Sequence, residues 1–450
     1  MKHNIYSKLG IVAITVAMAL PVYAQNGKNL SMDEAISLSL QNSKQLKLSK
    51  AKVDEAVANY KDAWNNHLPD VKASASVLYI NNPTIDLKLN TGGSGTSTTT
   101  ATAFPKVNEA AYGMVNASIP LFSGLRIKYG AESAKYLELA AKMDADNDKE
   151  GVIQNTIDAY SNLYKASKSI ELVKENLKQE QQRVTDFTNL ESNGIIARND
   201  LLKAQLQESN IELSLLDAEN NLRITYENMD LMLGLPEGTE LIPDSTGFLG
   251  QADAGSIASW EQTALQSRKD ISSLALRQKA ATSSIKAAKG EYYPSIALTG
   301  GYVDLYLQNL ATINNAVNAG IGLQYNFGSL WKTGAKVEAA KARLHELEAN
   351  QEMLSDAVRL QITQAYENYL LSVRKIDVYA KAIDQANENY RITSNKYTNS
   401  LVTTTDLIDA DVAQLQAQIN FAFSKADAFV AYKKLQQTAG VLSNSYNSNK

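Results

Sequence analysis

The chain has 450 residues, with no cysteine and 3 histidines, and its 44 basic and 48 acidic side chains give a net charge of −4. Without cysteine the chain cannot form disulfides, thiolate metal sites or a cysteine nucleophile. The balanced charge does not favour nucleic acid as a partner. We expect no metal, no cofactor and no catalytic residues, because the histidines are far apart in the sequence and no G-x-S-x-G, H-E-x-x-H or phosphate-binding glycine loop occurs in a suitable context.

The first residues have the pattern of a secretory signal peptide. Lys2 and Lys8 precede an apolar run that extends from Leu9 to Val22. The run ends in Val22-Tyr23-Ala24, a small-residue cleavage pattern. The alternative is an N-terminal membrane anchor, but a run of about 14 residues is shorter than the roughly 20 that a spanning helix needs. We therefore expect residues 1–24 to be a signal peptide and the mature protein to be exported.

The rest of the chain repeats itself. Residues 40–44 (Leu-Gln-Asn-Ser-Lys) match residues 265–269 (Leu-Gln-Ser-Arg-Lys) at a shift of 225, and Val152, Ala159, Tyr160 and Asn162 recur at a shift of 206 as Val358, Ala365, Tyr366 and Asn368. A constant shift over many residues predicts two copies of one unit, at 25–250 and 251–442, followed by a tail at 443–450. The first copy contains about 20 extra residues around a polar loop, 87–103, which we expect to face outside.

Each copy predicts the same order of elements. Apolar residues at steps of three or four, without proline, predict long amphipathic helices, and about 66 residues at 1.5 Å each give a helix of roughly 100 Å. The first and third helices of a copy together match the second in length, which predicts an antiparallel rod. The first copy has helices at 31–66, 125–190 and 200–233 with strands at 71–80 and 112–121; the second has helices at 256–292, 330–398 and 405–440 with strands at 295–303 and 317–327.

The four strands alternate between small apolar residues and polar residues or glycine. In 317–327, for example, Val317, Ile321 and Leu323 alternate with Asn318, Gly322 and Gln324. About 10 residues of such alternation is the length of a transmembrane β-strand. A soluble sheet with one face against a helix is the alternative. Aromatic residues at the strand ends favour the membrane, where they would form an interfacial girdle.

Four strands are too few to close a barrel, and an open sheet edge has no water to pair with in lipid. Two chains would give 8 strands and three would give 12, and the polar, glycine-rich inner faces favour a water-filled pore. We therefore predict an α+β membrane protein with internal duplication. A homotrimer would form a 12-stranded outer-membrane β-barrel, four strands per chain, continued by a long periplasmic α-helical barrel.

Residues 397–400 (Tyr-Thr-Asn-Ser) followed by 404–410 (Thr-Thr-Asp-Leu-Ile-Asp-Ala) form a turn and helix start that is repeated in the first copy at 192–202. With the helix ends at 233–236 and 438–442, this pattern resembles the TolC-like outer-membrane efflux protein family, the outer-membrane factors, over essentially the whole mature chain. The resemblance implies a passive, non-enzymatic exit duct in outer-membrane lipid, for tripartite efflux or type I secretion. Its partners would be a periplasmic adaptor and an inner-membrane pump of the RND, ABC or MFS type. A structural or adhesive coiled-coil protein without a pore is the alternative.

The resemblance also implies roles for single residues. Asp406 and Asp409 would form acidic rings that gate the periplasmic end, and Asp200 and Tyr397 would form a latch between neighbouring helix pairs. Val402 stands where family members can carry a basic residue of this latch, and Arg198 is a candidate substitute. Alternatively, Asp200 and Asp406 are first-turn dipole residues or N-caps, whereas Asp409 lies too deep in its helix for a cap.

The two turns at the far ends of the predicted rods are Asn193-Gly194 and Asn399-Ser400. These residue types suit a backbone with positive φ. We expect an adaptor to dock at these tips. The alternative is that each is only a turn between antiparallel helices.

Overall fold

The structure, a computed structural model, describes residues 27–81, 107–245, 248 and 253–447. The expected signal peptide and the polar loop at 87–103 lie outside these residues. The chain divides into two compact units. A helical unit contains the described residues up to Ser49, Ala145–Lys269, and those from Ser355 onward, and a sheet unit contains Lys50–Asp144 and Asp270–Leu354. Each unit therefore takes segments from both sequence repeats.

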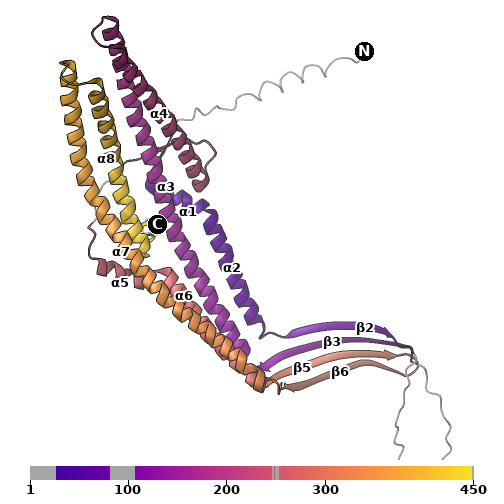
Figure 1. Cartoon of the computed structure of the whole chain (residues 1–450). Helices are drawn as coiled ribbons and strands as arrows, with labels where there is room; N and C mark the ends of the chain where they lie inside the picture. The colour runs from indigo at the N-terminus through magenta and orange to yellow at the C-terminus, as the bar shows by residue number, and fades with distance from the viewer. Residues whose placement is uncertain (1–26, 82–106, 246–247, 249–252, 448–450) are drawn as a thin grey trace, which may run out of the picture. The chain divides into compact units, whose positions relative to one another are not determined.

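Long helices dominate the helical unit (Figure 1). The two longest, each several times the usual length of about 11–12 residues, enter it from the sheet unit; they are α3 (Arg126–Ser192) and α7 (Ser329–Thr398). They are accompanied by α4 (Arg198–Leu233) and α8 (Thr404–Thr438), by α1 (Met32–Asn42) and α5 (Ile257–Ser267), and by the four-residue α9 (Asn444–Asn447) in the predicted tail. No described helix combines the length and the apolar character that crossing a membrane requires.

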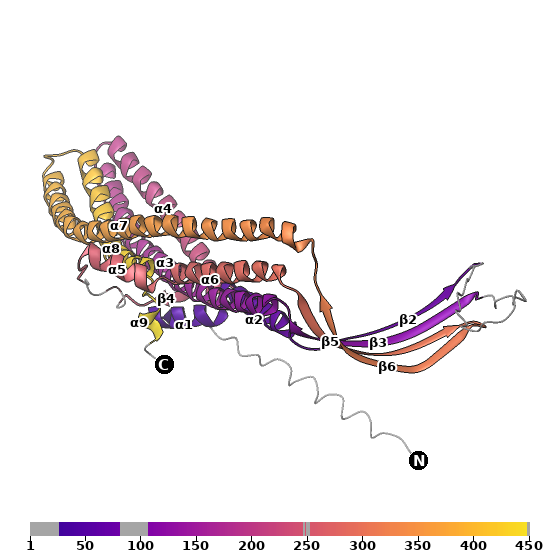
Figure 2. The same cartoon turned by 90° about the horizontal axis from the view of Figure 1, so that it is seen from below.

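The sheet unit contains four antiparallel strands in the order β2-β3-β5-β6 (Figure 2). Their bounds are β2 Asp70–Tyr79, β3 Glu109–Phe122, β5 Ser295–Leu307 and β6 Ala311–Gln324, and most of α2 (Lys44–Asn65), α6 (Lys269–Lys289) and a 3-10 turn (Gly290–Tyr292) accompany them. The β3–β5 pairing joins the two repeats. Apolar side chains such as Val77, Val317 and Ile321 are exposed. The long helices and the four-stranded sheet with two repeated halves confirm the predicted fold of the chain.

Two predicted helices are wrong as single elements. The helix expected at 31–66 is interrupted at Ser43, and the one expected at 256–292 is interrupted at Arg268 and ends in the 3-10 turn. Both break residues leave the helical conformation, with ψ of 120° and 129°. Helix α2 then starts afresh, because the Ser43 hydroxyl accepts the backbone N–H of Leu46 at 3.2 Å, as an N-cap does.

The interruptions serve the ends of two other helices. The amide of Asn42 donates to the carbonyl of Leu233 at the end of α4 (2.6 Å), and the Arg268 guanidinium donates to the carbonyl of Thr438 at the end of α8 (3.0 Å). In each case a glycine in the left-handed region, Gly234 or Gly440, follows the capped helix. These carbonyls have no partner inside their own helix, so each break places a donor where one is needed.

Three of the four strands, β3, β5 and β6, are longer than the sequence pattern predicted, and the strand expected at 317–327 in fact begins at Ala311 and ends at Gln324. The β5–β6 ladder has an irregularity between Val303 and Leu305. Opposite it, Asn315 has a φ of 58°, and its backbone N–H donates to Asp304 at 2.8 Å. This bulge disrupts the two-residue alternation on which the prediction depended.

The main core of the helical unit surrounds Tyr160 of α3, which is completely buried. Its hydroxyl lies 2.7 Å from the carbonyl oxygen of Leu30 and accepts the N–H of Asp244 at 2.8 Å. It thus joins the C-terminal ends of two short parallel strands that the sequence analysis missed, β1 (Lys28–Leu30) and β4 (Leu241–Pro243). Burial raises the pKa of Tyr160 to about 12, so this hydroxyl stays protonated.

Replacing Gly440 with alanine should destabilise the protein more than replacing Gly194. Both glycines have positive φ, near 72°, and alanine costs roughly 1 kcal/mol there. A Cβ at Gly440 would also lie 2.9 Å from the Cα of Arg268, whereas a Cβ at Gly194 meets no atom within 4 Å. Thermal unfolding followed by circular dichroism should therefore show a lower Tm for Gly440→Ala than for Gly194→Ala. Equal Tm values for the two variants would contradict a close packing of Gly440 against Arg268.

Candidate functional site

The two ends of the helix pairs α3–α4 and α7–α8 have the same turn geometry. The N–H of Ile195 donates to the carbonyl of Leu190, and the N–H of Leu401 donates to that of Lys396, each at 2.9 Å. Gly194 (φ 71°) and Ser400 (φ 56°) occupy the left-handed position between them. This six-to-one bond past a left-handed residue closes a helix in the Schellman manner.

The asparagines of these turns face inward on their own helices. The side-chain amide of Asn193 donates to the carbonyl of Asn189 (2.6 Å), and that of Asn399 donates to the carbonyl of Asn395 (2.8 Å). The next apolar residues instead point into solvent: Ile195 is 68% and Leu401 is 72% exposed. In a closed helix end of this kind, such a residue commonly packs against the last turn, so each turn presents an apolar side chain without its usual contact.

Beneath the turns, a small core holds the four helices together. It is formed by buried residues from three helices, with half-buried residues such as Tyr390 and Tyr397 of α7 against them; the buried members are Phe187, Leu201, Ala204 and Leu407. The ring of Tyr397 stacks on that of Phe187, with centroids 5.5 Å apart and planes inclined by 19°. The start of α8 is thus fixed to α3 and α4 near the turns.

Asp406 takes part in a capping box at the start of α8. Its Oδ2 accepts the backbone N–H of Thr403 (2.8 Å) and the Thr403 hydroxyl (2.7 Å), while the Thr403 hydroxyl oxygen accepts the backbone N–H of Asp406 (3.2 Å). These bonds, the hydroxyl first, lower the pKa of Asp406. The N-cap is therefore Thr403, and Asp406 is its partner three residues on.

Asp409 lies one turn further along α8 and is exposed, as is Asp406. The opposite side of this segment is buried through Thr404, Leu407 and Asp411. Because the cap bonds of Asp406 use only Oδ2, its second oxygen and the whole Asp409 carboxylate belong to one solvent-facing acidic surface.

The predicted latch residues have other partners within the chain. Asp200 is the third residue of α4, whose N-cap Ala197 makes no side-chain bond, and the nearest cation is Lys203, with Nζ–Oδ1 at 3.8 Å. Arg198 instead lies 3.5 Å from Glu191. The Tyr397 hydroxyl accepts the Thr404 hydroxyl at 3.4 Å. No hydrogen bond or ion pair of the described residues joins Asp200 to Tyr397 or to Arg198.

The sequence analysis missed a cluster of buried charges between α3 and α8. The guanidinium of Arg183 donates to Glu180 and, at 3.2 Å, to Asp411; it also donates to the Tyr390 hydroxyl at 3.0 Å. Glu180 and Asp411 are at most 1% exposed. A signal existed, because Thr404, Leu407 and Asp411 follow helical spacing and so place Asp411 on the buried face.

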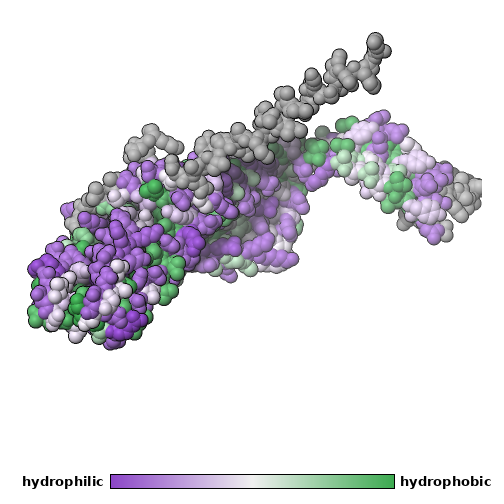
Figure 3. Space-filling model, turned by 90° about the horizontal axis from the view of Figure 1, so that it is seen from above, coloured by the Kyte–Doolittle hydropathy of each residue, from purple (hydrophilic) through white to green (hydrophobic). Residues whose placement is uncertain are grey.

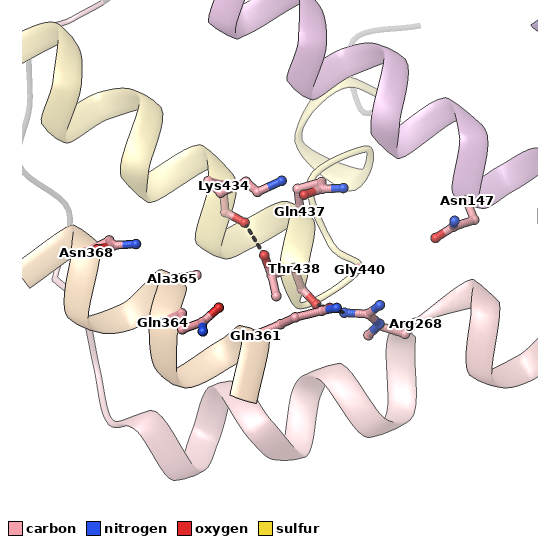
Figure 4. Close-up of a pocket in the computed structure, with 10 residues that line it drawn as sticks. All are labelled: Asn147, Arg268, Gln361, Gln364, Ala365, Asn368, Lys434, Gln437, Thr438 and Gly440. Atoms are coloured by element: carbon pink, nitrogen blue, oxygen red, sulfur yellow. Dashed lines mark hydrogen bonds between the residues drawn. The ribbon is translucent and has the colours of Figure 1, made fainter. Parts of the chain in front are cut away.

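A polar cavity of about 450 Å³ lies near the end of α8 (Figure 4). Two cations, Arg268 and Lys434, line it together with amide side chains such as Gln364 and Asn368. Arg268 is held by Gln361 (2.9 Å) as well as by the carbonyl of Thr438. The lining of the cavity contains no carboxylate, and the hydroxyl of Thr438 donates to the carbonyl of Lys434 at 2.8 Å.

The long paired helices, the four-stranded sheet with exposed apolar side chains and the repeated geometry of the two turns are the features of a subunit of an outer-membrane channel. The family model described as "Outer membrane efflux protein" matches residues 35–235 and 260–441. The chain therefore belongs to the outer membrane efflux protein family, which confirms the TolC-like resemblance. It is an outer-membrane channel of tripartite efflux or type I secretion systems in Gram-negative bacteria, and not an enzyme or a pore-less adhesive protein.

Known relatives are distant in sequence. The chain is 22% identical over 310 residues to the alkaline protease secretion protein AprF of Pseudomonas aeruginosa, a match that covers 66% of this chain and 63% of that protein. It is 23% identical to the outer membrane efflux protein BepC of Brucella suis, over 85% of this chain and 81% of the relative. The solved structure of the Campylobacter jejuni CmeC outer membrane channel has a TM-score of 0.76 at 17% identity, over 91% of this chain and 86% of CmeC.

Proposed function

We propose that three copies of this chain form one continuous exit duct, with a 12-stranded barrel in the outer membrane and a tube of helices in the periplasm. The observation that carries the proposal is the open sheet: β2 and β6 each pair on one side only in the described sheet. Unpaired backbone groups are too costly in hydrocarbon, so identical neighbours would supply the missing pairing. Three copies give 12 strands and leave a lumen, whereas two give 8 and a filled interior.

An apolar stripe on α4 supports a matching contact in the periplasm. Six exposed residues share it: Leu202, Leu206, Leu213, Leu216, Ile224 and Leu231. At about 100° per residue they fall within an arc of about 80°. The buried face of α4, which includes Leu201, Ala204 and Met229, lies on the opposite side. Helix α4 therefore has two apolar faces, of which its own chain covers one.

Helix α7 has the same character. Leu360, Leu371 and Val378 are exposed and share one side, while Val358, Ile362 and Tyr369 are buried on the other. Leu216 lies 22 residues from Gly194, and Val378 lies 22 residues from Ser400, so the two stripes reach the same depth below the turns. This match supports packing of α4 of one copy against α7 of the next, which is the head-to-tail contact that closes a ring.

The hydropathy of the surface supports such a contact, because Figure 3 shows hydrophobic patches among a largely hydrophilic surface over the helices.

At the turns, the exposed Ile195 and Leu401 support docking of the tip of a periplasmic adaptor around Asn193-Gly194 and Asn399-Ser400. The adaptor would connect the duct to an inner-membrane pump of the RND, ABC or MFS type.

The acidic surface of Asp406 and Asp409 supports a gate. In a trimer these residues would form two rings of three carboxylates, which repel one another and attract cations. Asp200, Tyr397 and Arg198 would form the latch between helix pairs of the assembly, and Lys203, beside Asp200, supplies a further cation there.

The trimer contact should be sensitive to charge on the α4 stripe. Leu213→Glu puts a carboxylate into a face whose leucines stabilise by up to roughly 1.5–3 kcal/mol each when fully buried, so monomer should appear in detergent, as measured by mass photometry. Asn210→Glu, which adds the same charge outside the stripe, should remain trimeric. In the cysteine-free chain, the pair Leu216→Cys and Val378→Cys should crosslink between copies. The contact is rejected if Leu213→Glu stays trimeric and the cysteine pair forms no crosslink between copies.

The gate can be separated from the helix cap. Replacing both Asp406 and Asp409 with alanine should raise single-channel conductance in planar bilayers several-fold, or weaken block by divalent cations. Thr403→Ala breaks the capping box, at a cost of about 1 kcal/mol, but keeps both charges, and should leave conductance and block unchanged. If both proteins conduct and are blocked as the parent is, the acidic rings do not form the gate.

Adaptor docking should require the apolar tips. A photocrosslinker at Asn193 or Asn399 should capture an adaptor in intact cells, to be identified by mass spectrometry. Combining Ile195→Ser with Leu401→Ser should reduce this capture by an order of magnitude, because the apolar contact is lost. Leu137→Ser, at an exposed apolar position of α3 far from the turns in sequence, is the control. Undiminished capture would contradict docking through these side chains.

A further inference from the structure

The charge cluster of Glu180, Arg183 and Asp411 is buried, which is unusual for three ionisable side chains. It lies at the same depth on both of its helices, since Arg183 precedes Gly194 by 11 residues and Asp411 follows Ser400 by 11. We propose that Glu180 is a proton-binding site that holds α8 against α3, and that loss of its proton loosens this contact behind the gate. The inference builds on the proposed channel and adds a mode of regulation to it.

The hydrogen bonds distinguish the two carboxyl groups. Asp411 has a donor on each oxygen, Arg183 on Oδ1 (3.2 Å) and Asn176 on Oδ2 (3.0 Å), which is the environment of an ionised carboxylate. Glu180 receives Arg183 on Oε1, but its buried Oε2 has no partner among the described residues. An ionised Glu180 would leave a charged oxygen unsatisfied, whereas the neutral acid carries a hydrogen there.

The Asp411 carboxylate is an acceptor for that hydrogen. It lies on α8, within hydrogen-bonding reach of Glu180. A proton on Glu180 would therefore form a bond between α3 and α8 that the ionised form cannot make.

The charges support the same assignment. The groups that face Glu180 are Arg183 and Asn176 from its own helix, Asp411 from α8 and, through Arg183, Tyr390 from α7. With both carboxyls ionised, one guanidinium leaves a net buried charge of −1, which is unfavourable without a further partner. Burial, opposed by Arg183 and assisted by Asp411, raises the pKa of Glu180 to about 7.

The sign of the effect follows from linkage. When α8 separates from α3 and Glu180 meets water, its pKa returns towards the ordinary 4.5. Between these values the packed state binds one more proton than the separated state, so packing is favoured at low pH and weakens as the pH rises through about 7. Asp406 titrates in a different range, because its bonds to Thr403 lower its pKa.

The test uses the intact protein in detergent or bilayers, with Glu180→Gln as a neutral variant of the same shape. Infrared difference spectra of the parent should show a protonated carboxyl that titrates near pH 7 and is missing in Glu180→Gln. Spin labels on Lys178→Cys and Ala413→Cys should report a wider α3–α8 separation at about pH 8 than at about pH 6. In Glu180→Gln the separation should stay at its low-pH value, and Glu175→Gln, at an exposed position of α3, should behave as the parent does.

A second variant tests the role of the like charge. Asp411→Asn leaves Arg183 to balance Glu180 alone, so the titration should move down by about one pH unit or more. The inference is overturned if no buried carboxyl titrates near neutral pH, if Glu180→Gln keeps the pH response of the parent, or if titration occurs without a change in separation. Conductance of the parent at fixed pH tests the channel itself, and its absence would reject the proposed function while leaving these titrations readable.

Discussion

The backbone groups on the open edges of β2 and β6 constrain the rest of this molecule. In hydrocarbon they have no water to bond, so the sheet of one chain is an incomplete structure. The helices are incomplete in a similar sense, because α4 and α7 each carry a second apolar face opposite the one that their own chain covers. One operation, the addition of identical neighbours around a common axis, would complete both, which is why membrane and periplasmic parts can share one symmetry.

The duplication explains much of the architecture. The two copies differ, however, at the starts of α4 and α8 beside the turns, where the proposed gate lies. Gly234 and Gly440 form equivalent joints, and the two turns have the same bonds. Yet at the shift of 206, Lys203 of the first copy corresponds to Asp409 of the second, and Ala197 corresponds to the capping residue Thr403. The first copy therefore neutralises its own acidic residue, while the second retains two carboxylates on a capped helix. An acidic gate would thus arise from one repeat only.

The features of the fold that repeat at a regular spacing could be predicted from the sequence. The long helices, the strand faces and the left-handed residues of the turns follow from spacing and residue type, and the bounds of α3, α4, α7 and α8 agree with the prediction within two residues. The breaks at Ser43 and Arg268 were not predictable in this way, because the contacts beside them reach helix ends that are 191 and 170 residues away in the sequence. The β1–β4 pair depends similarly on Tyr160. The charge cluster and the capping box left local signals, but only the packing of α8 on α3 reveals which charges meet.

The position of the cluster relative to the repeats gives it a particular meaning. Duplication relates α3 to α7 and α4 to α8, so the contact of α3 with α8 inside one chain corresponds to a contact of α7 with α4 between neighbours in the proposed ring. Asp411, however, corresponds to the exposed Gln205 of α4, and Arg183 corresponds to Asn389 of α7. The charge cluster therefore belongs to the α3–α8 contact inside each chain. The equivalent contact between chains would be held by the apolar stripe on α4. A change of pH would then loosen the contact between α3 and α8 within each subunit and leave the contacts between subunits intact.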